Sequence, residues 1–439
     1  MGASSNPKVT HHNHHSHHHH HREGNIKVFL ISDIHFDAKE NERFIEQMPS
    51  SSNSNNNKDD DCYSILIIAG DVAEKLSDLE RCLRMCLKKF DCVFYTFGNH
   101  DLWCASKEEE EEKCSLEKIQ SVFKLCERLG VKTDPSSGEE IGGSNDDDAK
   151  RRVFIAPVHS WYEREFDTEE EVEAPEGVSI PGVERVMTDY RLCKWPKLDA
   201  WKKEITKTTT IKSDDYYISK KIDALNDADG KFERFLENVK RAKEEGKDVT
   251  VITFSHFLPR IELIPEKRFL LYPKLTQAVG SHILNERIER VTEILHLEKS
   301  GKDSHTHAFG HTHFGWNLVL ENNVRYVQAA LATPKEWVRR PRSLVVGEFF
   351  SNAPGNSPLL LYDSRTNAFS GSSSNIKEYN PGLWAKYYEE NARDPSNKTL
   401  APWVLSYVSR VWGSRELKKS MMMTSNTDAS PLPGKSGQV

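Results

Sequence analysis

Long hydrophobic runs are absent from this 439-residue chain, and so is the paired cysteine spacing of a disulfide framework. No apolar stretch approaches the ~20 residues that a membrane-spanning helix needs. The N-terminal region also lacks the apolar core of a secretory signal. Eight cysteines scattered along a chain of this length are typical of reduced thiols inside the cell. The composition therefore predicts a soluble, intracellular protein, cytoplasmic in location and without a membrane partner.

A strong excess of charge is also missing, because 60 basic residues and 67 acidic ones leave a formal net charge of −7. Broad binding to nucleic acid or to anionic lipid needs the opposite sign, so we do not expect nucleic acid as a partner. Hydrophobic residues make up only 37% of the chain, and the shortfall is concentrated in a few polar tracts. The remainder has enough Val, Ile, Leu and Phe to bury one substantial core.

The polar tracts set the expected domain boundaries, since such segments cannot bury an apolar face. Residues 1–24 include a histidine-rich run from His11 to His21 and are expected to be disordered. Residues 414–439 are expected to form a disordered tail. Polar or acidic insertions are expected at residues 50–61, 108–112 and 138–150. One domain over residues 25–413 remains.

Short apolar runs divide the rest of the chain, and each stops at a glycine or a polar residue. These predicted strands cover residues 26–32, 63–69, 92–97, 249–254 and 306–309. Apolar residues recur at helical spacing in residues 74–89, 115–129, 230–245 and 285–298. Continuously apolar strands indicate a sheet that is covered by helices on both faces.

Polar motifs follow directly after these five strands. In chain order they are Asp33-Ile34-His35, Gly70-Asp71, Gly98-Asn99-His100-Asp101, His256 and Gly310-His311-Thr312-His313. A single Asp after a strand is usually a turn or a helix cap, and a single His is more often an ordinary core residue. Five motifs at five strand ends are hard to explain in that way, because strand ends converge at one edge of an α/β sheet. Their oxygen and nitrogen atoms are numerous enough to hold two metal ions.

The ordered set resembles the calcineurin-like metallophosphoesterase superfamily, whose pattern is D-x-H, G-D, G-N-H-[DE], H and G-H-x-H. The resemblance spans residues 26–328, and residues 97–104, 252–260 and 325–330 are similar to an uncharacterised plant and algal branch. It implies an α/β fold of the four-layer type, a two-sheet β-sandwich flanked by helices, instead of a simple open sheet. Residues 160–246 have no match in the family core. We expect either a cap that helps to set substrate choice or a surface excursion packed on the core.

The resemblance also implies a role for each motif residue. The implied ligands are Asp33, His35 and His313 for the first metal, Asn99, His256 and His311 for the second, and Asp71 for both. Manganese, iron or zinc would suit this mixed set, with manganese or iron favoured by its oxygen ligands. His100 is expected to donate a proton to the leaving alcohol or to stabilise its developing charge, and Asp101 to orient His100.

Together these features predict a metal-dependent phosphoesterase, in which a hydroxide bridging two metals attacks a phosphomonoester or phosphodiester. Glu74 and Lys75 stand where protein Ser/Thr phosphatases of the superfamily carry D-R in G-D-x-x-D-R-G. Glu74 also replaces the tyrosine ligand of purple acid phosphatases. A nuclease of the same superfamily is the first alternative, which the acidic balance disfavours. The second is a non-catalytic scaffold, which the complete ligand set disfavours.

Overall fold

The structure is a computed structural model that describes residues 22–23, 25–50, 62–104, 114–136, 138–142, 151–206, 212–297, 303–339, 357–365, 368–369 and 382–418. Most of the predicted disordered tracts lie outside these residues. Three parts of them are ordered, however. Arg22–Glu23 and Glu139–Gly142 form strands β1 and β5, and residues 414–418 are held by the bond from Lys418 N–H to the Ser414 carbonyl. The division into one domain and two disordered tails stays a prediction.

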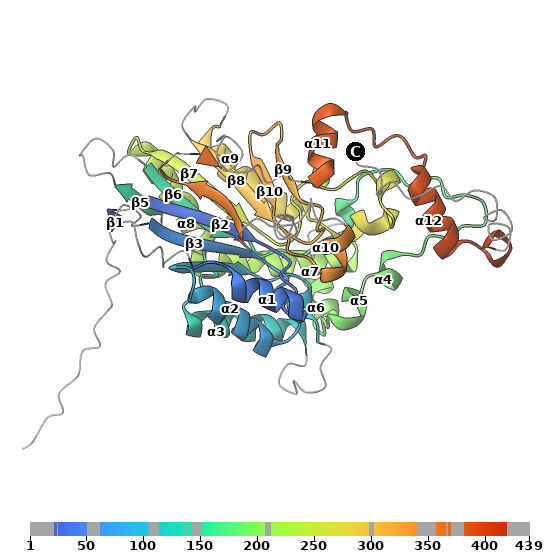
Figure 1. The fold of residues 1–439 in the computed structure, drawn as a ribbon, viewed down its shortest axis with the longest axis horizontal. Coiled ribbons are helices and arrows are strands. Elements are labelled where there is room, and N and C mark those ends of the chain that lie inside the picture. Colours follow the sequence, from blue (N-terminus) through green and yellow to red (C-terminus); the bar gives the residue numbers. More distant parts are fainter. Residues whose placement is uncertain are drawn as a thin grey trace, which may run out of the picture.

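Two β-sheets form the centre of the molecule (Figure 1). The five-stranded sheet has the order β12 (Ala368–Phe369), β11 (Leu359–Asp363), β2 (Asn25–Ile31), β3 (Cys62–Ala69) and β4 (Cys92–Thr96). The seven-stranded sheet has the order β1, β5, β6 (Arg151–Pro157), β7 (Asp248–Phe254), β8 (Ser304–Phe309), β10 (Arg325–Gln328) and β9 (Trp316–Val319). The five predicted strands are confirmed as β2, β3, β4, β7 and β8.

Parallel strands make up the middle of both sheets. In one sheet β2, β3 and β4 are parallel, and in the other β6, β7, β8 and β10 are parallel. A parallel bridge between Ser32 and Ala330 joins the two groups just beyond β2 and β10. The C-terminal ends of the two sets of parallel strands therefore meet at one edge of the sandwich.

Helices cover the outer faces of the two sheets. On the side of the five-stranded sheet, α1 (Lys39–Gln47), α2 (Leu76–Leu87) and α3 (Ser115–Leu129) lie together (Figure 1). On the other sheet, α8 (Lys231–Glu244) packs on β6 and β7, and α9 (His282–Leu295) packs on β8. The four predicted helices correspond to α2, α3, α8 and α9. Two mixed sheets flanked by helices confirm the predicted fold class.

The largest hydrophobic cluster joins the two sheets. Val28, Leu30 and Ile67 contribute from one sheet, and Ile252 and Val327 contribute from the other. Each of these side chains is fully buried. Because both inner faces are apolar, the two sheets are stabilised by packing against each other, and the strand ends that carry the motifs are held in fixed positions.

The segment between the third and fourth motifs packs against this core. It contains α4 (Val183–Val186), α5 (Asp189–Leu192), α6 (Leu198–Ile205) and α7 (Asp214–Asp223) in addition to α8. Its residues Trp161 and Tyr162 are 1% exposed and belong to the same hydrophobic cluster as the sheets. Removing this segment would therefore open the core, and its influence on substrate choice stays a prediction.

The remaining elements follow the seven-stranded sheet along the chain. Helix α10 (Pro334–Arg339) follows β10, whereas α11 (Gly382–Glu390) and α12 (Pro402–Trp412) lie at the end of the molecule opposite β1 and β5 (Figure 1). Short 3-10 helices cover His100–Leu102, Arg164–Phe166, Ala224–Gly230, Ile261–Leu263, Lys267–Phe269 and Pro273–Ala278. Over the part of the chain that the structure describes, each helix is too short or too polar to cross a membrane.

Candidate metal centre

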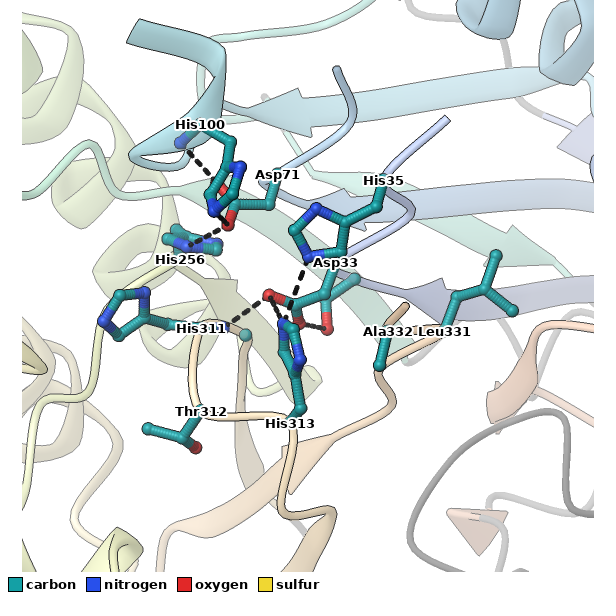
Figure 2. Close-up of polar contacts among 12 residues, drawn as sticks. Asp33, His35, Asp71, His100, His256, His311, Thr312, His313, Leu331 and Ala332 are labelled. Carbon is teal, nitrogen blue, oxygen red and sulfur yellow. Dashed lines mark hydrogen bonds and ion pairs between the residues drawn. The ribbon is translucent and has the colours of Figure 1, made fainter. Parts of the chain in front are cut away.

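The five motifs meet at the edge where the ends of the parallel strands from both sheets come together. Strands β2, β3 and β4 lead into the first three motifs, and β7 and β8 lead into the last two. Side chains from all five motifs point toward one shared space in Figure 2, where Asp33, His35, Asp71, His100, His256, His311 and His313 are labelled. The structure therefore brings together segments that lie more than 200 residues apart in the sequence.

An unusual backbone conformation accompanies this convergence. Five motif residues that are not glycine have a left-handed backbone: Asp33 (φ 51°), His35 (φ 44°), Asp71 (φ 54°), His311 (φ 74°) and His313 (φ 56°). Such a conformation costs on the order of 1–3 kcal/mol per residue and is concentrated at functional sites. Backbone hydrogen bonds hold it here, from Asp33 N–H to the Gly70 carbonyl and from His35 N–H to the Asp71 carbonyl, both 3.0 Å long.

The candidate ligand atoms fall into three groups of close neighbours. Those of Asp33, His35 and His313 lie within 4.8 Å of one another, and so do those of Asp71, His256 and His311. A third such group, formed by His35, Asp71 and His100, connects the two. The amide oxygen of Asn99 joins the second group, 3.1 Å from His256 Nε2 and 3.0 Å from His311 Nδ1. All seven predicted ligands are thus adjacent.

The orientation of these atoms fits cations. His35 Nε2 and His313 Nε2 face each other at 3.3 Å, and His313 Nε2 is 3.1 Å from Asp33 Oδ1. Without a metal one of these two nitrogens can donate a hydrogen bond to the other, whereas a metal between them would accept a lone pair from each. Imidazole, carboxylate and amide oxygen are the donors expected for manganese, iron or zinc. The residues present therefore fit a pair of metal ions.

The charges of the candidate ligands also favour a pair of bound metal ions. Burial opposes the charge on Asp33, but the nearby His313 holds the pKa of this carboxyl well below its usual range. Burial likewise disfavours a charged His313, but Asp33 and Glu336 raise its pKa to about 10. Burial lowers the pKa of His311 to about 3, helped by the neighbouring His256. Carboxylates thus attract positive charge into a buried site, where a bound metal would displace the proton of His313.

His100 lies beside the ligands but is more accessible than they are. Its side chain is 26% exposed, whereas those of Asp33 and His256 are 0% exposed. Its Nε2 is 4.0 Å from Asp71 Oδ2, and its Nδ1 is 3.9 Å from Glu74 Oε1. Burial and the neighbouring histidines hold the pKa of His100 below its ordinary value. An anionic substrate beside the ring would raise that pKa again and favour a proton on His100.

Asp101 differs from the expectation that it orients His100. Its Oδ2 accepts hydrogen bonds from the N–H groups of Asp71 (2.9 Å) and Gly98 (2.8 Å). Its Oδ1 accepts from those of Val72 (2.9 Å) and Ala73 (3.0 Å). Both Asp101 oxygens are thus occupied by backbone N–H groups, and this geometry makes Asp101 the anchor of the two loops that carry Asp71 and Asn99. The carboxylate that faces Nδ1 of His100 is instead that of Glu74.

Two carboxylates that contact the candidate ligands, the partly buried Glu336 and the buried Asp189, were missed by sequence reasoning. Glu336 of α10 accepts a hydrogen bond from His313 Nδ1 at 3.0 Å and from the Thr333 hydroxyl at 2.8 Å. Asp189 of α5 contacts Asn99 at 2.9 Å. Neither residue lies in a motif or follows one of the predicted strands, so no local pattern distinguishes them from other acidic residues of this charged chain.

Comparison with known proteins agrees with this geometry. Residues 26–200 match the family model described as calcineurin-like phosphoesterase. This part of the chain belongs to the calcineurin-like phosphoesterase family. The match covers the first three motifs with the candidate ligands Asp33, His35, Asp71 and Asn99, while His256, His311 and His313 lie beyond it. Assignment to the plant and algal branch of the superfamily stays a prediction.

Individual relatives of this chain are distant. An acyl-carrier-protein phosphodiesterase of Mycobacterium tuberculosis is 27% identical over 181 residues, which are 40% of this chain and 50% of the relative. The chain thus spans about half the length of the curated relative that it matches. The crystal structure of a phosphopantetheinyl hydrolase from M. tuberculosis aligns at 20% identity with a TM-score of 0.42, covering 73% of this chain and 94% of that chain. A dimetal phosphatase from Danio rerio aligns at 10% identity with a TM-score of 0.30, covering 70% and 87%.

Proposed function

We propose that this calcineurin-like phosphoesterase is a dinuclear-metal enzyme that hydrolyses a phosphate ester with water. The observation that carries the proposal is the convergence of Asp33, His35, Asp71, Asn99, His256, His311 and His313 in two adjacent groups that share one edge of the fold. Two ions bound there would supply a water of lowered pKa and would neutralise the charge of the phosphate oxygens. The family membership supports the same class of reaction.

Side chains beside the candidate metal site would act on the leaving group. His100 is the exposed member of the cluster, so its ring can reach the bridging oxygen of an ester bound over the buried ligands. It would donate a hydrogen bond or a proton to the leaving alcohol, which otherwise departs as a poor leaving group. Trp103 packs on the His100 ring with the ring centroids 3.7 Å apart, and Glu74 faces its Nδ1. These two neighbours would fix the ring toward the substrate.

A phosphodiester is the form of substrate that we favour. The M. tuberculosis relative is named as a phosphodiesterase of acyl carrier protein, and that name is the observation behind this preference. By analogy, the first substrate to examine is a carrier protein whose serine bears a phosphopantetheinyl group. Hydrolysis with water would break the bond between the serine oxygen and phosphorus and would release free phosphopantetheine and the unmodified serine.

A panel assay tests this proposal. The chain would be supplied with Mn²⁺ and incubated with p-nitrophenyl phosphate, bis(p-nitrophenyl) phosphate, double-stranded DNA and a phosphopantetheinylated carrier protein. We expect release of nitrophenol from the bis-ester and loss of the phosphopantetheinyl mass from the carrier protein. Cleavage of DNA alone would favour the nuclease alternative. No reaction with any of the four would favour the scaffold alternative and would contradict the proposal.

A further inference from the structure

Asp189 links the segment between the third and fourth motifs to the metal centre. It is the first residue of α5, it is 2% exposed, and it lies far along the chain from the ligand that it contacts. Its Oδ1 accepts a hydrogen bond from Asn99 Nδ2 at 2.9 Å and another from Trp103 Nε1 at 2.7 Å. One carboxylate oxygen thus contacts both a candidate metal ligand and the ring that packs on His100.

The contact with Asn99 has a directional consequence. Asp189 Oδ1 is the acceptor of this bond, so it favours the amide orientation that turns Nδ2 toward Asp189. The amide oxygen then faces the opposite way, toward His256 Nε2 at 3.1 Å and His311 Nδ1 at 3.0 Å. In the reverse orientation an NH₂ group, which cannot ligate a cation, would face those two histidines. Asp189 therefore favours the orientation in which Asn99 presents its oxygen atom toward the candidate metal site.

The contact with Trp103 acts on the neighbouring histidine. An indole N–H is a donor with no acceptor capacity, and its bond to a buried carboxylate fixes the plane of the ring. That ring is tilted 31° to His100 with a centroid separation of 3.7 Å, so His100 has little freedom to rotate away. The same Asp189 oxygen thus restrains Asn99 in the candidate metal site directly and His100 through Trp103.

We propose that Asp189 is a positioning residue that orients Asn99 toward the second metal and holds Trp103 against His100. The inference rests on the proposed function, because it assigns a role toward metals that the seven ligands would bind. It also gives residues 160–246, the inserted segment, a role that differs from substrate choice. Helix α5 of this segment contacts Asn99, a candidate ligand on the loop after β4.

The same segment offers a matched control. Asp215 of α7 is 3% exposed, and its Oδ2 accepts a hydrogen bond from the Tyr190 hydroxyl at 2.6 Å. It is therefore another buried carboxylate with an aromatic donor, but it does not contact Asn99 in the structure. Asp215→Ala removes a comparable group from the inserted segment, whereas Asp189→Ala removes the contact with Asn99.

The test measures Mn²⁺ binding by calorimetric titration of the metal-free chain, for the wild type and for the Asp189→Ala, Asp189→Asn and Asp215→Ala variants. Circular dichroism and thermal melting of the metal-free proteins establish that each variant is folded. We expect two ions per wild-type chain. In Asp189→Ala one of the two sites should weaken 10- to 100-fold, while the other stays within about twofold. Asp189→Asn keeps an acceptor oxygen and should recover part of the lost affinity, and Asp215→Ala should bind as the wild type does.

The possible failures are distinguishable. If the wild-type chain binds fewer than two Mn²⁺ ions, the dinuclear proposal is contradicted, and the role of Asp189 falls with it. If the wild type binds two ions and Asp189→Ala binds both with unchanged affinity, the proposed function stands and the role of Asp189 is overturned. Equal weakening of both sites in Asp189→Ala and Asp215→Ala would likewise overturn it, because that result indicates a general effect on folding.

Discussion

The residues around the candidate metal centre differ sharply in exposure and charge, and this difference suggests which of them would bind metal and which would contact the substrate. Buried carboxylates and imidazoles of the centre are surrounded by protein, so a cation is the partner that best offsets their desolvation. His100 lies at the margin of the cluster, where its side chain is 26% exposed and faces Asp71 at 4.0 Å. At the residue scale, the buried groups would hold metal, and the more exposed His100 would meet the substrate.

Replacing His100 tests this separation. His100→Ala should retain two metal ions, because its ring is not one of the seven predicted ligands. Its turnover of a phosphodiester should fall about 10²- to 10⁴-fold, the range typical for loss of a general acid. Elemental analysis of the purified variant and steady-state kinetics check the two halves of the prediction. Loss of metal from His100→Ala would show that the ring is a ligand.

Asp101 provides a second test, because its position in the structure differs from its predicted role. Its carboxylate accepts four backbone N–H groups in the loops that carry Asp71 and Asn99. Asp101→Asn places an NH₂ group against some of these donors, so we expect weaker Mn²⁺ binding as well as lower turnover. Metal binding measured by equilibrium dialysis decides the matter. Normal affinity with lost turnover would restore the original expectation that Asp101 acts on His100.

At the scale of elements, glycines allow the strand ends to approach one another. Gly98 lies just beyond the end of β4. A Cβ atom there would lie 2.1 Å from Asp71 Oδ1 and 2.7 Å from His256 Nε2. Both neighbours are buried in the candidate metal centre, so neither can move without displacing a ligand. The small size of Gly98 is thus a requirement of the site.

Gly98→Ala should therefore impair Mn²⁺ binding in a chain that still folds. Gly130→Ala is a suitable control, because Gly130 ends α3 with φ 78° and an added Cβ would meet no atom within 4 Å. The control should lose about 1–2 kcal/mol of unfolding free energy from backbone strain while its metal affinity is unchanged. Titration with Mn²⁺ and chemical denaturation measure the two effects. Equal metal affinity in both variants would refute the steric argument.

The helices and strands also show which parts of the structure could be predicted from the sequence. The strands that precede the motifs were predictable, because β2, β3, β4, β7 and β8 are apolar runs that end at distinctive residues. The convergence of the candidate ligands was predictable for the same reason, and their role toward metal stays a prediction. Strand β6 and helix α1 were not predicted, and neither was the contact of Glu336 with His313. That contact depends on where α10 packs, and such tertiary placement leaves no local signature.

The inserted segment was the least predictable element. Its aromatic residues were consistent with a cap or with a surface excursion, and the sequence offered no means to choose. In the structure Trp161 and Tyr162 lie in the main core, with ring centroids 5.3 Å and 5.5 Å from Phe257. Phe257 in turn contacts the rings of His256 and His311. The segment thus packs on Phe257, which contacts two residues of the candidate metal centre, and this arrangement depends on contacts between distant parts of the chain.

At the scale of the whole molecule, a buried acid makes stability depend on pH. Burial raises the pKa of Asp215 to about 7, although Tyr190 and Arg164 oppose this effect and Asp214 and Glu165 reinforce it. A folded-state pKa above the unfolded value means that the native protein binds the proton more tightly. The resulting stabilisation is complete below pH ~4 and is lost as the pH rises to about 7.

Asp215→Asn removes this titration. Relative to the variant, the wild type should therefore lose unfolding free energy between pH 4 and pH 7, by an amount on the order of a few kcal/mol. Denaturant unfolding of both proteins across this range measures the difference. A difference that stays constant with pH would mean that Asp215 titrates normally, and a difference of opposite slope would mean that its pKa is lowered in the folded state.

The central claim is that two ions held by residues from both sheets carry the hydrolysis. The most direct measurement is the rate of bis(p-nitrophenyl) phosphate hydrolysis during titration of the metal-free chain with Mn²⁺, for the wild type and for Asp71→Asn, which lacks the carboxylate predicted to bridge the two ions. We predict that wild-type activity rises until two ions are bound per chain and that Asp71→Asn shows almost none. Activity that survives removal of metal, or that is equal in the two proteins, would contradict the account.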